Sequence, residues 1–292
     1  MTSALFFAII SPFLWGFVNI FDKYIIVKKV RNPISFTTIA SIISFIISLI
    51  LIFLLDWSEI SYKAMLVPIF TGILYGFQVL LYYYFLKKED VSTLVGFVYT
   101  YPLFVAILSF FFLNEILSIT SYIGMILILT GVLMLSVRLK RIKLKVAVWV
   151  IISIILITSI YEFCIKITTL NMPEINGLSI QLLTSNFVVF TTLFNKKIRK
   201  DFYKELKNFR FAVLIEILTI FATLTIYLAM SGLSATIVTS ISAIQPLAVL
   251  FYERIADKIF GKMQRDHLLL PKLSAISLMV LGIILLYISE IT

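Results

Sequence analysis

The chain has little charge and almost no cysteine or histidine. Only 14% of its 292 residues are charged, against about 25% in soluble domains, so the composition argues against a soluble protein. Cys164 is the single cysteine, which excludes an intrachain disulfide and says little about the redox compartment. His267 is the single histidine and lies in a charged connector. We therefore expect no His/Cys metal site and no cofactor.

Long apolar runs make up most of the chain. Hydrophobic residues account for 61% of the sequence, and a helix needs roughly 20 apolar residues to span a bilayer. The first run has no basic region before it and no small-residue cleavage site, so we expect a span and not a signal peptide. We predict an all-α integral membrane protein with ten transmembrane helices. The expected spans are residues 4–27, 34–55, 64–86, 91–113, 118–137, 146–168, 175–195, 211–231, 234–252 and 273–289.

Basic residues are distributed unevenly among the connectors. Of the 25 lysines and arginines, 22 lie in odd-numbered connectors, and Lys63 alone lies in an even-numbered one. By the positive-inside rule, the odd connectors are expected to be cytoplasmic and both termini outside, in a multi-pass protein of the cell membrane. The net charge of +10 also favours anionic membrane lipid. Nucleic-acid binding is not expected, even for the basic run 196–200, because no recognised binding module fits between the spans.

Related residues recur at a nearly fixed interval. Lys23 and Lys166 are 143 residues apart, and Pro102 and Pro246 are 144 apart. Each half then contains five spans, an odd number, so the two halves must enter the membrane in opposite orientations. Such inverted repeats usually hold the substrate near the membrane midplane, between the halves. The predicted units are a first five-helix repeat at 1–137, a basic linker at 138–145 and a second five-helix repeat at 146–292.

Several short motifs occur along the chain in a definite order. They are Trp15–Lys23, Tyr82–Leu86, Tyr99–Phe104, Leu113–Glu115 and Gly124–Val132. In order and spacing they resemble the drug/metabolite transporter superfamily, in its EamA-like ten-helix form. The resemblance implies a secondary transporter that moves small organic solutes, commonly amino acids, nucleotide sugars or other metabolites.

Two features depart from the pattern of that family. Residues 252–258 replace the usual apolar run that ends in a glutamate, so the ninth helix is expected to be shorter or frayed at that end. Family members are also commonly described with cytoplasmic termini, whereas the basic connectors here indicate termini outside. We keep the orientation that the basic residues indicate.

The two lysines within apolar spans are the first candidates for a site. A charge near the bilayer centre costs at least a few kcal/mol, so such residues usually line a polar cavity. Glu162 and Lys166 are four residues apart and share a helix face, and Asn19 and Lys23 have the same spacing. These four side chains are predicted to bind substrate, the lysines attracting a carboxylate or phosphate. Alternatively, each lysine extends to the interface and keeps its charge in water.

Acidic residues within the spans are candidates for coupling transport to protons. They are Asp22, Glu162 and Glu216. Glu216 follows the basic connector 196–210, so pairing with that connector is the alternative for it. Glu115 ends the fourth span, where we expect it to anchor the following turn.

Aromatic and amide side chains form a second candidate surface. Tyr75 and Tyr82 are seven residues apart on the third span, and Gln78 lies between them on the same face. Tyr99 and Tyr101 flank a predicted break within the span 91–113. We predict that Gln78, Tyr82, Tyr99 and Tyr101 contact substrate. The alternative for any tyrosine in a membrane protein is the interfacial aromatic belt.

Two prolines are predicted to break their spans. Proline removes a backbone donor and disfavours helix at the residue before it. Pro102 follows Tyr101, and Pro246 follows Gln245, which we add to the substrate-binding residues. Freed carbonyls in a membrane are tolerated only where they face protein or water, so both breaks are expected to line the cavity and act as hinges.

These features favour a transporter over two other classes. The leading hypothesis is a secondary transporter, and not an enzyme, that moves a small polar metabolite by alternating access, as a monomer or homodimer. A flippase for a lipid or lipid-linked sugar would instead need a groove open to lipid. A membrane-embedded lipid enzyme would need a nucleophile with its base, or paired acids at metal spacing, and the spans show neither.

Overall fold

The computed structural model describes residues 2–86, 98–136, 144–260 and 270–291. Within these residues all regular secondary structure is helical, with no strand. Two short 3-10 segments, Thr191–Phe194 and Leu206–Asn208, flank α9. The α-helices are α1 (Thr2–Lys28), α2 (Pro33–Leu54), α3 (Tyr62–Leu86), α5 (Tyr101–Leu113), α6 (Ile119–Ser136), α7 (Leu144–Asn171), α8 (Glu174–Phe190), α9 (Lys196–Glu205), α10 (Phe209–Gly232), α11 (Ala235–Ser242), α12 (Gln245–Phe260) and α13 (Leu270–Ile291).

Seven stretches of helix are long and apolar enough to cross a membrane. They lie at Ser3–Lys28, Pro33–Leu54, Tyr62–Tyr84, Ile152–Asn171, Glu174–Phe194, Lys196–Gly232 and Ala235–Ala256. Three shorter apolar helices lie at Tyr101–Leu113, Ile119–Met134 and Ser274–Ser289. The chain is therefore a multi-pass membrane protein. The number of ten spans stays a prediction, because seven candidate spans are found among the described residues.

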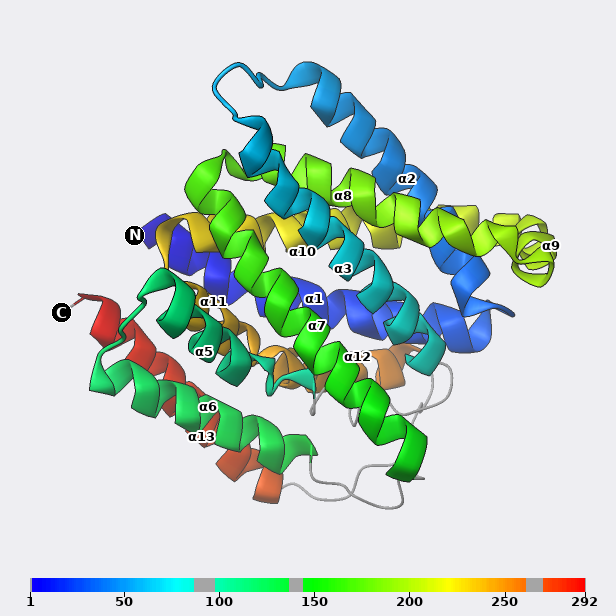
Figure 1. Cartoon of the computed structure of the whole chain (residues 1–292). Helices are drawn as coiled ribbons and strands as arrows, with labels where there is room; N and C mark the ends of the chain where they lie inside the picture. The colour runs from blue at the N-terminus through cyan, green and yellow to red at the C-terminus, as the bar shows by residue number, and fades with distance from the viewer. Residues whose placement is uncertain (1, 87–97, 137–143, 261–269, 292) are drawn as a thin grey trace.

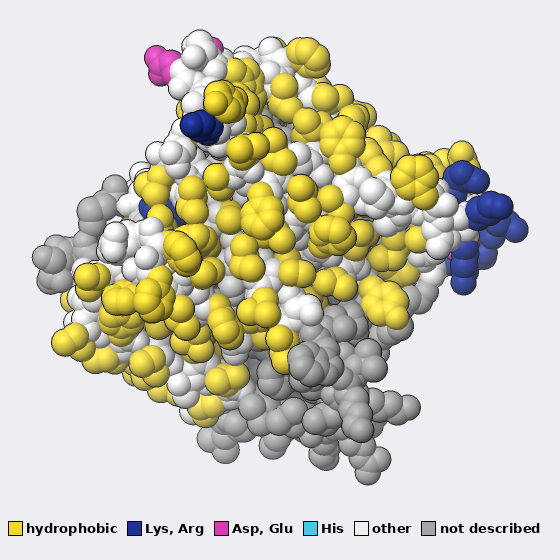
Figure 2. Space-filling model, viewed as in Figure 1, with side chains coloured by type: hydrophobic (Ala, Val, Ile, Leu, Met, Phe, Trp, Pro, Cys, Tyr) yellow, Lys and Arg dark blue, Asp and Glu magenta, His cyan; other side chains and the backbone are white. Residues whose placement is uncertain are grey.

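The helices expose apolar side chains and bury polar ones. On α2, Phe53 is 84% exposed, whereas Thr37, Ser41 and Ser44 are buried. The hydroxyl groups of Thr37 and Ser41 donate to the carbonyls of Pro33 and Thr37, each at 3.0 Å, so both donors are satisfied within the helix. In Figure 2 apolar side chains cover much of the visible face, and dark-blue Lys and Arg side chains gather at its α9 end. This distribution is the one expected of a surface in contact with hydrocarbon.

Small residues allow several helix pairs to approach closely. A Cβ atom placed on Gly124 of α6 would lie 2.8 Å from the carbonyl oxygen of Gly282 on α13. A Cβ on Gly76 of α3 would lie 2.8 Å from the Ser185 carbonyl on α8, and one on Gly16 of α1 would lie 2.7 Å from the Cβ of Ala248 on α12. Close packing of this kind stabilises helix pairs in membranes, where no hydrophobic force drives them together.

Hydrogen bonds identify two opposite ends of the helical bundle. At one end, Asn176 at the start of α8 donates to the Asp56 carbonyl in the α2–α3 connector, at 2.9 Å. At the same end, Glu115 after α5 accepts from the backbone of Ala235 at the start of α11, at 3.1 Å. At the other end, which we call the basic end, the α1–α2 connector meets α9. The basic end carries most of the described lysines and arginines, including those of α9 (Figures 1 and 2).

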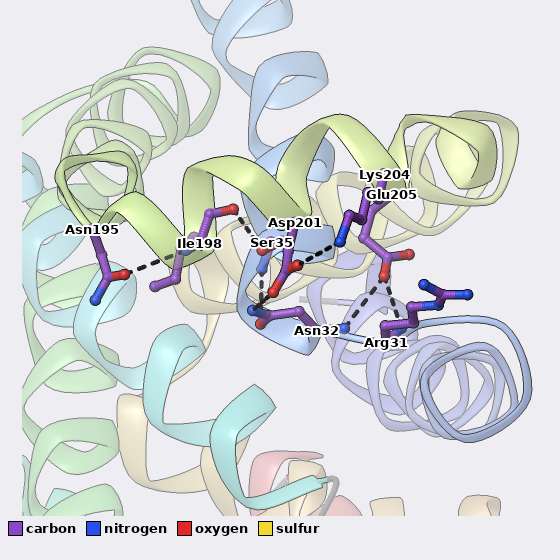
Figure 3. A network of polar contacts seen from close by, with 8 residues as sticks. All are labelled: Arg31, Asn32, Ser35, Asn195, Ile198, Asp201, Lys204 and Glu205. Atoms are coloured by element: carbon purple, nitrogen blue, oxygen red, sulfur yellow. Dashed lines mark hydrogen bonds and ion pairs between the residues drawn. The ribbon is translucent and has the colours of Figure 1, made fainter.

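Acidic and amide side chains join the two halves of the chain at the basic end (Figure 3). Oε1 of Glu205, which is buried, accepts from the backbone N–H groups of Arg31 (2.8 Å) and Asn32 (3.3 Å). Asp201 accepts from Nδ2 of Asn32 at 3.0 Å, and the Ser35 hydroxyl donates to the carbonyl of Ile198 at 3.0 Å. We call these contacts the basic-end joint. They fix α9 across the ends of α1 and α2.

One sequence prediction about the ninth span is wrong. The helix does not fray after Tyr252, because α12 continues as far as Phe260. The span predicted at 234–252 is instead two helices, α11 and α12, separated at Ala243 and Ile244. The acids and bases after Tyr252 are compatible with this extension, because a charged helix is stable where it leaves the hydrocarbon region.

Candidate functional site

A polar cavity lies inside the bundle, between its middle and the basic end. The volume open to the centre of a water-sized sphere is about 140 Å³. One water molecule needs roughly 10–15 Å³ by that measure, so the cavity has room for a small organic molecule. Its walls come from α1, α2, α3, α7, α8 and α10, together with the start of α5 and the junction of α11 and α12. Both halves of the chain therefore contribute to the lining.

The wall between α1 and α3 pairs polar groups with tyrosines. Asn19 and Asp22 are three residues apart on α1, so both point to the same side, and both are buried. The Tyr82 hydroxyl donates to Oδ1 of Asn19 at 3.2 Å. The Tyr83 hydroxyl donates to Oδ1 of Asp22 at 2.8 Å. These tyrosines hold the α1 side chains in place and present their own rings to the cavity.

The α7 wall carries the carboxylate of Glu162. This side chain is 3% exposed, and its Oε1 accepts from the hydroxyl of Tyr161 at 2.9 Å. Its Oε2 has no hydrogen-bond partner among the residues that the structure describes. One turn earlier, Thr158 accepts from Nε2 of Gln78 on α3, at 2.9 Å. The ring of Tyr161 meets that of Tyr75 edge to face, with centroids 5.7 Å apart.

Helix breaks form the third side of the cavity. Helix α5 begins at Tyr101 and α12 begins at Gln245, so Pro102 and Pro246 each lie in the first turn of a helix. Each proline is tolerated there because its missing N–H would have no partner within the helix. Tyr99, Tyr101 and Gln245 all line the cavity, and the Ser159 hydroxyl donates to the Tyr101 carbonyl at 3.3 Å. The breaks lie where the sequence predicts, and the hinge role of the prolines stays a prediction.

Glu216 supplies a third carboxylate. It lies on α10 and lines the cavity together with Thr219. Its carboxylate is close enough to that of Asp22 for the two to interact electrostatically. The sequence left open whether Glu216 pairs with the connector 196–210, and the structure turns it toward the cavity.

Lys166 serves a different part of the molecule. Its Nζ donates to the carbonyls of Met230 and Leu233, at 2.8 Å each. The Met230 carbonyl lies in the last turn of α10 and the Leu233 carbonyl directly follows the helix, so the ammonium sits at the negative end of the helix dipole. Neither Lys166 nor the half-buried Lys23 lines the cavity. Glu162 and Lys166, although one turn apart, therefore face different environments.

Glu115 complements Lys166 at the same junction. Its Oε1 accepts from the backbone of Ala235, and its Oε2 accepts from the Thr236 hydroxyl at 3.4 Å. A carboxylate at the start of α11 and an ammonium at the end of α10 are each placed where the helix dipole favours them. The sequence placed Glu115 at a turn but did not identify α11 as its partner.

Several lining residues were missed by the sequence argument. Small hydroxyl residues such as Thr37 and Ser41 on α2, and Ser185 on α8, line the cavity beside Asn186. Hydroxyl groups are common throughout the spans and often bond to their own helix, so none of them stands out. The available signal was the spacing of Thr37, Ser41 and Ser44, which lie on one face of α2.

The chain was also compared with known protein families and structures. Residues 2–137 match the model of the EamA-like transporter family. These residues are therefore similar to members of that family. The resemblance to the drug/metabolite transporter superfamily is thereby confirmed. Among curated proteins no match is found.

Solved structures share the fold of this chain. One, titled "Crystal structure of protein", has a TM-score of 0.70 at 15% sequence identity and covers 99% of each chain. At this identity the likeness concerns the fold alone. The shared fold includes the residues after 137.

Proposed function

We infer that this protein is a secondary transporter that moves a small polar organic metabolite through the central cavity. The observation that carries this proposal is a cavity with polar and aromatic side chains inside an apolar helical bundle, lined by both halves of the chain. A membrane protein keeps polar groups at this depth where they contact a solute or line its path.

The helix contacts support two inverted repeats of five spans each. We assign the spans of the first repeat to α1, α2, α3, the predicted span 91–113 that includes α5, and α6. Their counterparts are α7, α8, α10, the pair α11–α12, and α13. Helix α1 packs on α10, and its counterpart α7 packs on α3. Helix α2 packs on α10 as α8 packs on α3, and α6 packs on its own counterpart α13. A twofold axis in the membrane plane produces this exchange of partners.

The two ends of the bundle suggest how access alternates. The cavity extends toward the basic end, which we place in the cytoplasm on the basis of its lysines and arginines. At the opposite end, Lys166 and Glu115 hold the junction of α10 and α11 together. In the proposed cycle the halves rock about the cavity, with the helix breaks at Pro102 and Pro246 as hinges. Protonation of Asp22, Glu162 or Glu216 would couple this motion to a proton gradient.

Thiol labelling from the two sides of the membrane tests the aqueous pathway. In a Cys164→Ser background, Gln78→Cys places a thiol on the cavity wall, and Phe77→Cys places one on the exposed neighbouring position. The proposal expects water-soluble, membrane-impermeant thiol reagents to label Gln78→Cys but not Phe77→Cys. A Gln78→Cys thiol that reacts only with lipid-soluble reagents would point instead to a groove open to the bilayer, as a flippase requires.

Proteoliposome flux then tests the transport itself. Uptake of a labelled amino acid or other metabolite should depend on the protein and show counterflow when the vesicles are preloaded. Uptake that does not change with an imposed pH gradient would remove the coupling step while leaving the carrier intact.

A further inference from the structure

The charged side chains among the described residues of the cavity lining are all acidic. Among the residues that the structure describes, the lining contains three carboxylates, those of Asp22, Glu162 and Glu216, and no lysine, arginine or histidine. The ammonium of Lys166 is outside this lining and donates to two carbonyls at the end of α10. In a region of low dielectric constant, such a set of acids attracts a cation and disfavours an anion.

The carboxylate of Glu162 is also incompletely satisfied. Its Oε1 accepts from Tyr161, but its buried Oε2 has no partner in the described part of the chain. A buried acceptor without a donor is costly, and such groups usually meet a ligand or water. An N–H donor with positive charge would satisfy both the open hydrogen-bonding position and the charge.

The tyrosines around these carboxylates suit the same ligand. Tyr75 lies near enough to Asp22, Glu162 and Glu216 to interact electrostatically with all three. Tyr82, Tyr99, Tyr101 and Tyr161 line the cavity as well. Aromatic faces attract organic cations through their quadrupole, and the interaction strengthens when the cation is shielded from water.

We propose that the cavity binds a substrate that carries a protonated amine, with an ammonium N–H donated to Oε2 of Glu162 and the carbon skeleton packed among the tyrosine rings. This inference rests on the proposed transport function and specifies the substrate class of the same cavity. It replaces the expectation that an anionic group binds to the lysines. A substrate that also carries a carboxylate remains compatible, because Trp15 Nε1 and Asn186 Nδ2 in the lining are donors without a partner in the described residues.

The sign of the cavity potential can be measured without knowing the substrate. The Gln78→Cys thiol, in the Cys164→Ser background, is treated with cationic and anionic methanethiosulfonate reagents of similar size. Both react with the same thiolate, so the ratio of their rate constants, normalised to a small thiol in free solution, reports the local field. We expect a preference of at least tenfold for the cationic reagent. Glu162→Gln should reduce this preference, whereas Glu59→Gln, in the exposed α2–α3 connector, should leave it unchanged.

Protection from labelling tests recognition of the amine. Three probes of nearly equal shape are compared: 3-phenylpropylamine, 3-phenylpropanol and 3-phenylpropionate. The amine should slow labelling of Gln78→Cys at least tenfold more effectively than the other two, and Glu162→Gln should abolish this difference. The inference would be overturned if the anionic reagent reacts as fast as the cationic one or faster, or if 3-phenylpropionate protects better than the amine. Either result would still be compatible with a water-accessible carrier cavity. If neither water-soluble reagent labels the thiol, the cavity has no aqueous access and the proposed transport function fails as well.

Discussion

Two charged side chains on α7, one helical turn apart, show how differently a membrane protein can use buried charge. Lys166 is satisfied by two carbonyls at the end of α10, a contact that stabilises the fold. Glu162 faces the cavity with one carboxylate oxygen free of any partner in the described residues. At both positions a charge is buried within the membrane, which costs free energy. What separates a structural charge from a functional one is therefore its set of partners, not its depth in the membrane.

The strongest test of this contrast removes the structural charge. Lys166→Met keeps the length of the side chain but leaves the carbonyls of Met230 and Leu233 without their donor. Losing charge-assisted hydrogen bonds and leaving buried acceptors unsatisfied is expected to cost about 3 kcal/mol of stability. Thermal unfolding of the purified protein measures the loss, and Lys63→Met, at an exposed position in the first turn of α3, is the control.

Protection of the Gln78→Cys thiol by the amine tests whether Lys166 stabilises the fold or contacts the substrate. When Lys166→Met is combined with Gln78→Cys, the amine should protect the thiol of the folded protein as well as it does when Lys166 is present. A variant that keeps its stability but loses ligand protection would make Lys166 a substrate contact, and the contrast with Glu162 would fail.

The basic-end joint provides a second structural charge for comparison. Glu205 accepts from Arg31, Asn32 and the side chain of Asn208, the last at 2.8 Å through its Oε2. Glu205→Gln keeps the shape but weakens these bonds and turns one acceptor into a donor, so we expect a loss of about 2 kcal/mol. Glu174→Gln, on the only partly buried start of α8, is the control in the same unfolding assay. Equal unfolding temperatures for the two variants would mean that the joint does not support the fold.

Removing the functional charge is expected to have the opposite effect on stability. Glu162→Gln preserves the acceptor for Tyr161 and removes a buried charge with no cationic partner in the described residues, so stability should stay equal or rise. Flux of an amine substrate should fall at least tenfold, which corresponds to about 1.4 kcal/mol. Proteoliposome flux and thermal unfolding are measured on the same preparation. A variant that unfolds several degrees earlier would assign Glu162 to the fold instead.

The sequence could predict what depends on local composition and no more than that. Hydropathy identified the apolar helices, and Pro102 and Pro246 marked the helix breaks because proline acts on its immediate neighbours. The depth of Asp22, Glu162 and Glu216 was also readable from position along each span. The partners of Lys166 were not, because Met230 and Leu233 lie 64 and 67 residues further along the chain. The Glu162–Lys166 spacing suggested a pair, and only the packing of α10 on α7 shows that the lysine is used elsewhere.

The smallest effect is expected from Asp201, which belongs to the basic-end joint but lies near the surface. The hydrogen bond from Asn32 holds the pKa of this carboxyl below its usual range, with smaller contributions from the charges of Lys204, Lys197 and Lys200. A carboxyl whose pKa is lowered in the folded state stabilises the fold above its unfolded pKa, and this contribution is lost as pH falls through the folded pKa. On acidification from pH 6 to pH 3, the wild-type protein should therefore lose slightly more thermal stability than Asp201→Asn. Parallel acid curves for the two proteins would show that the charge of Asp201, unlike that of Glu205, contributes nothing to the joint.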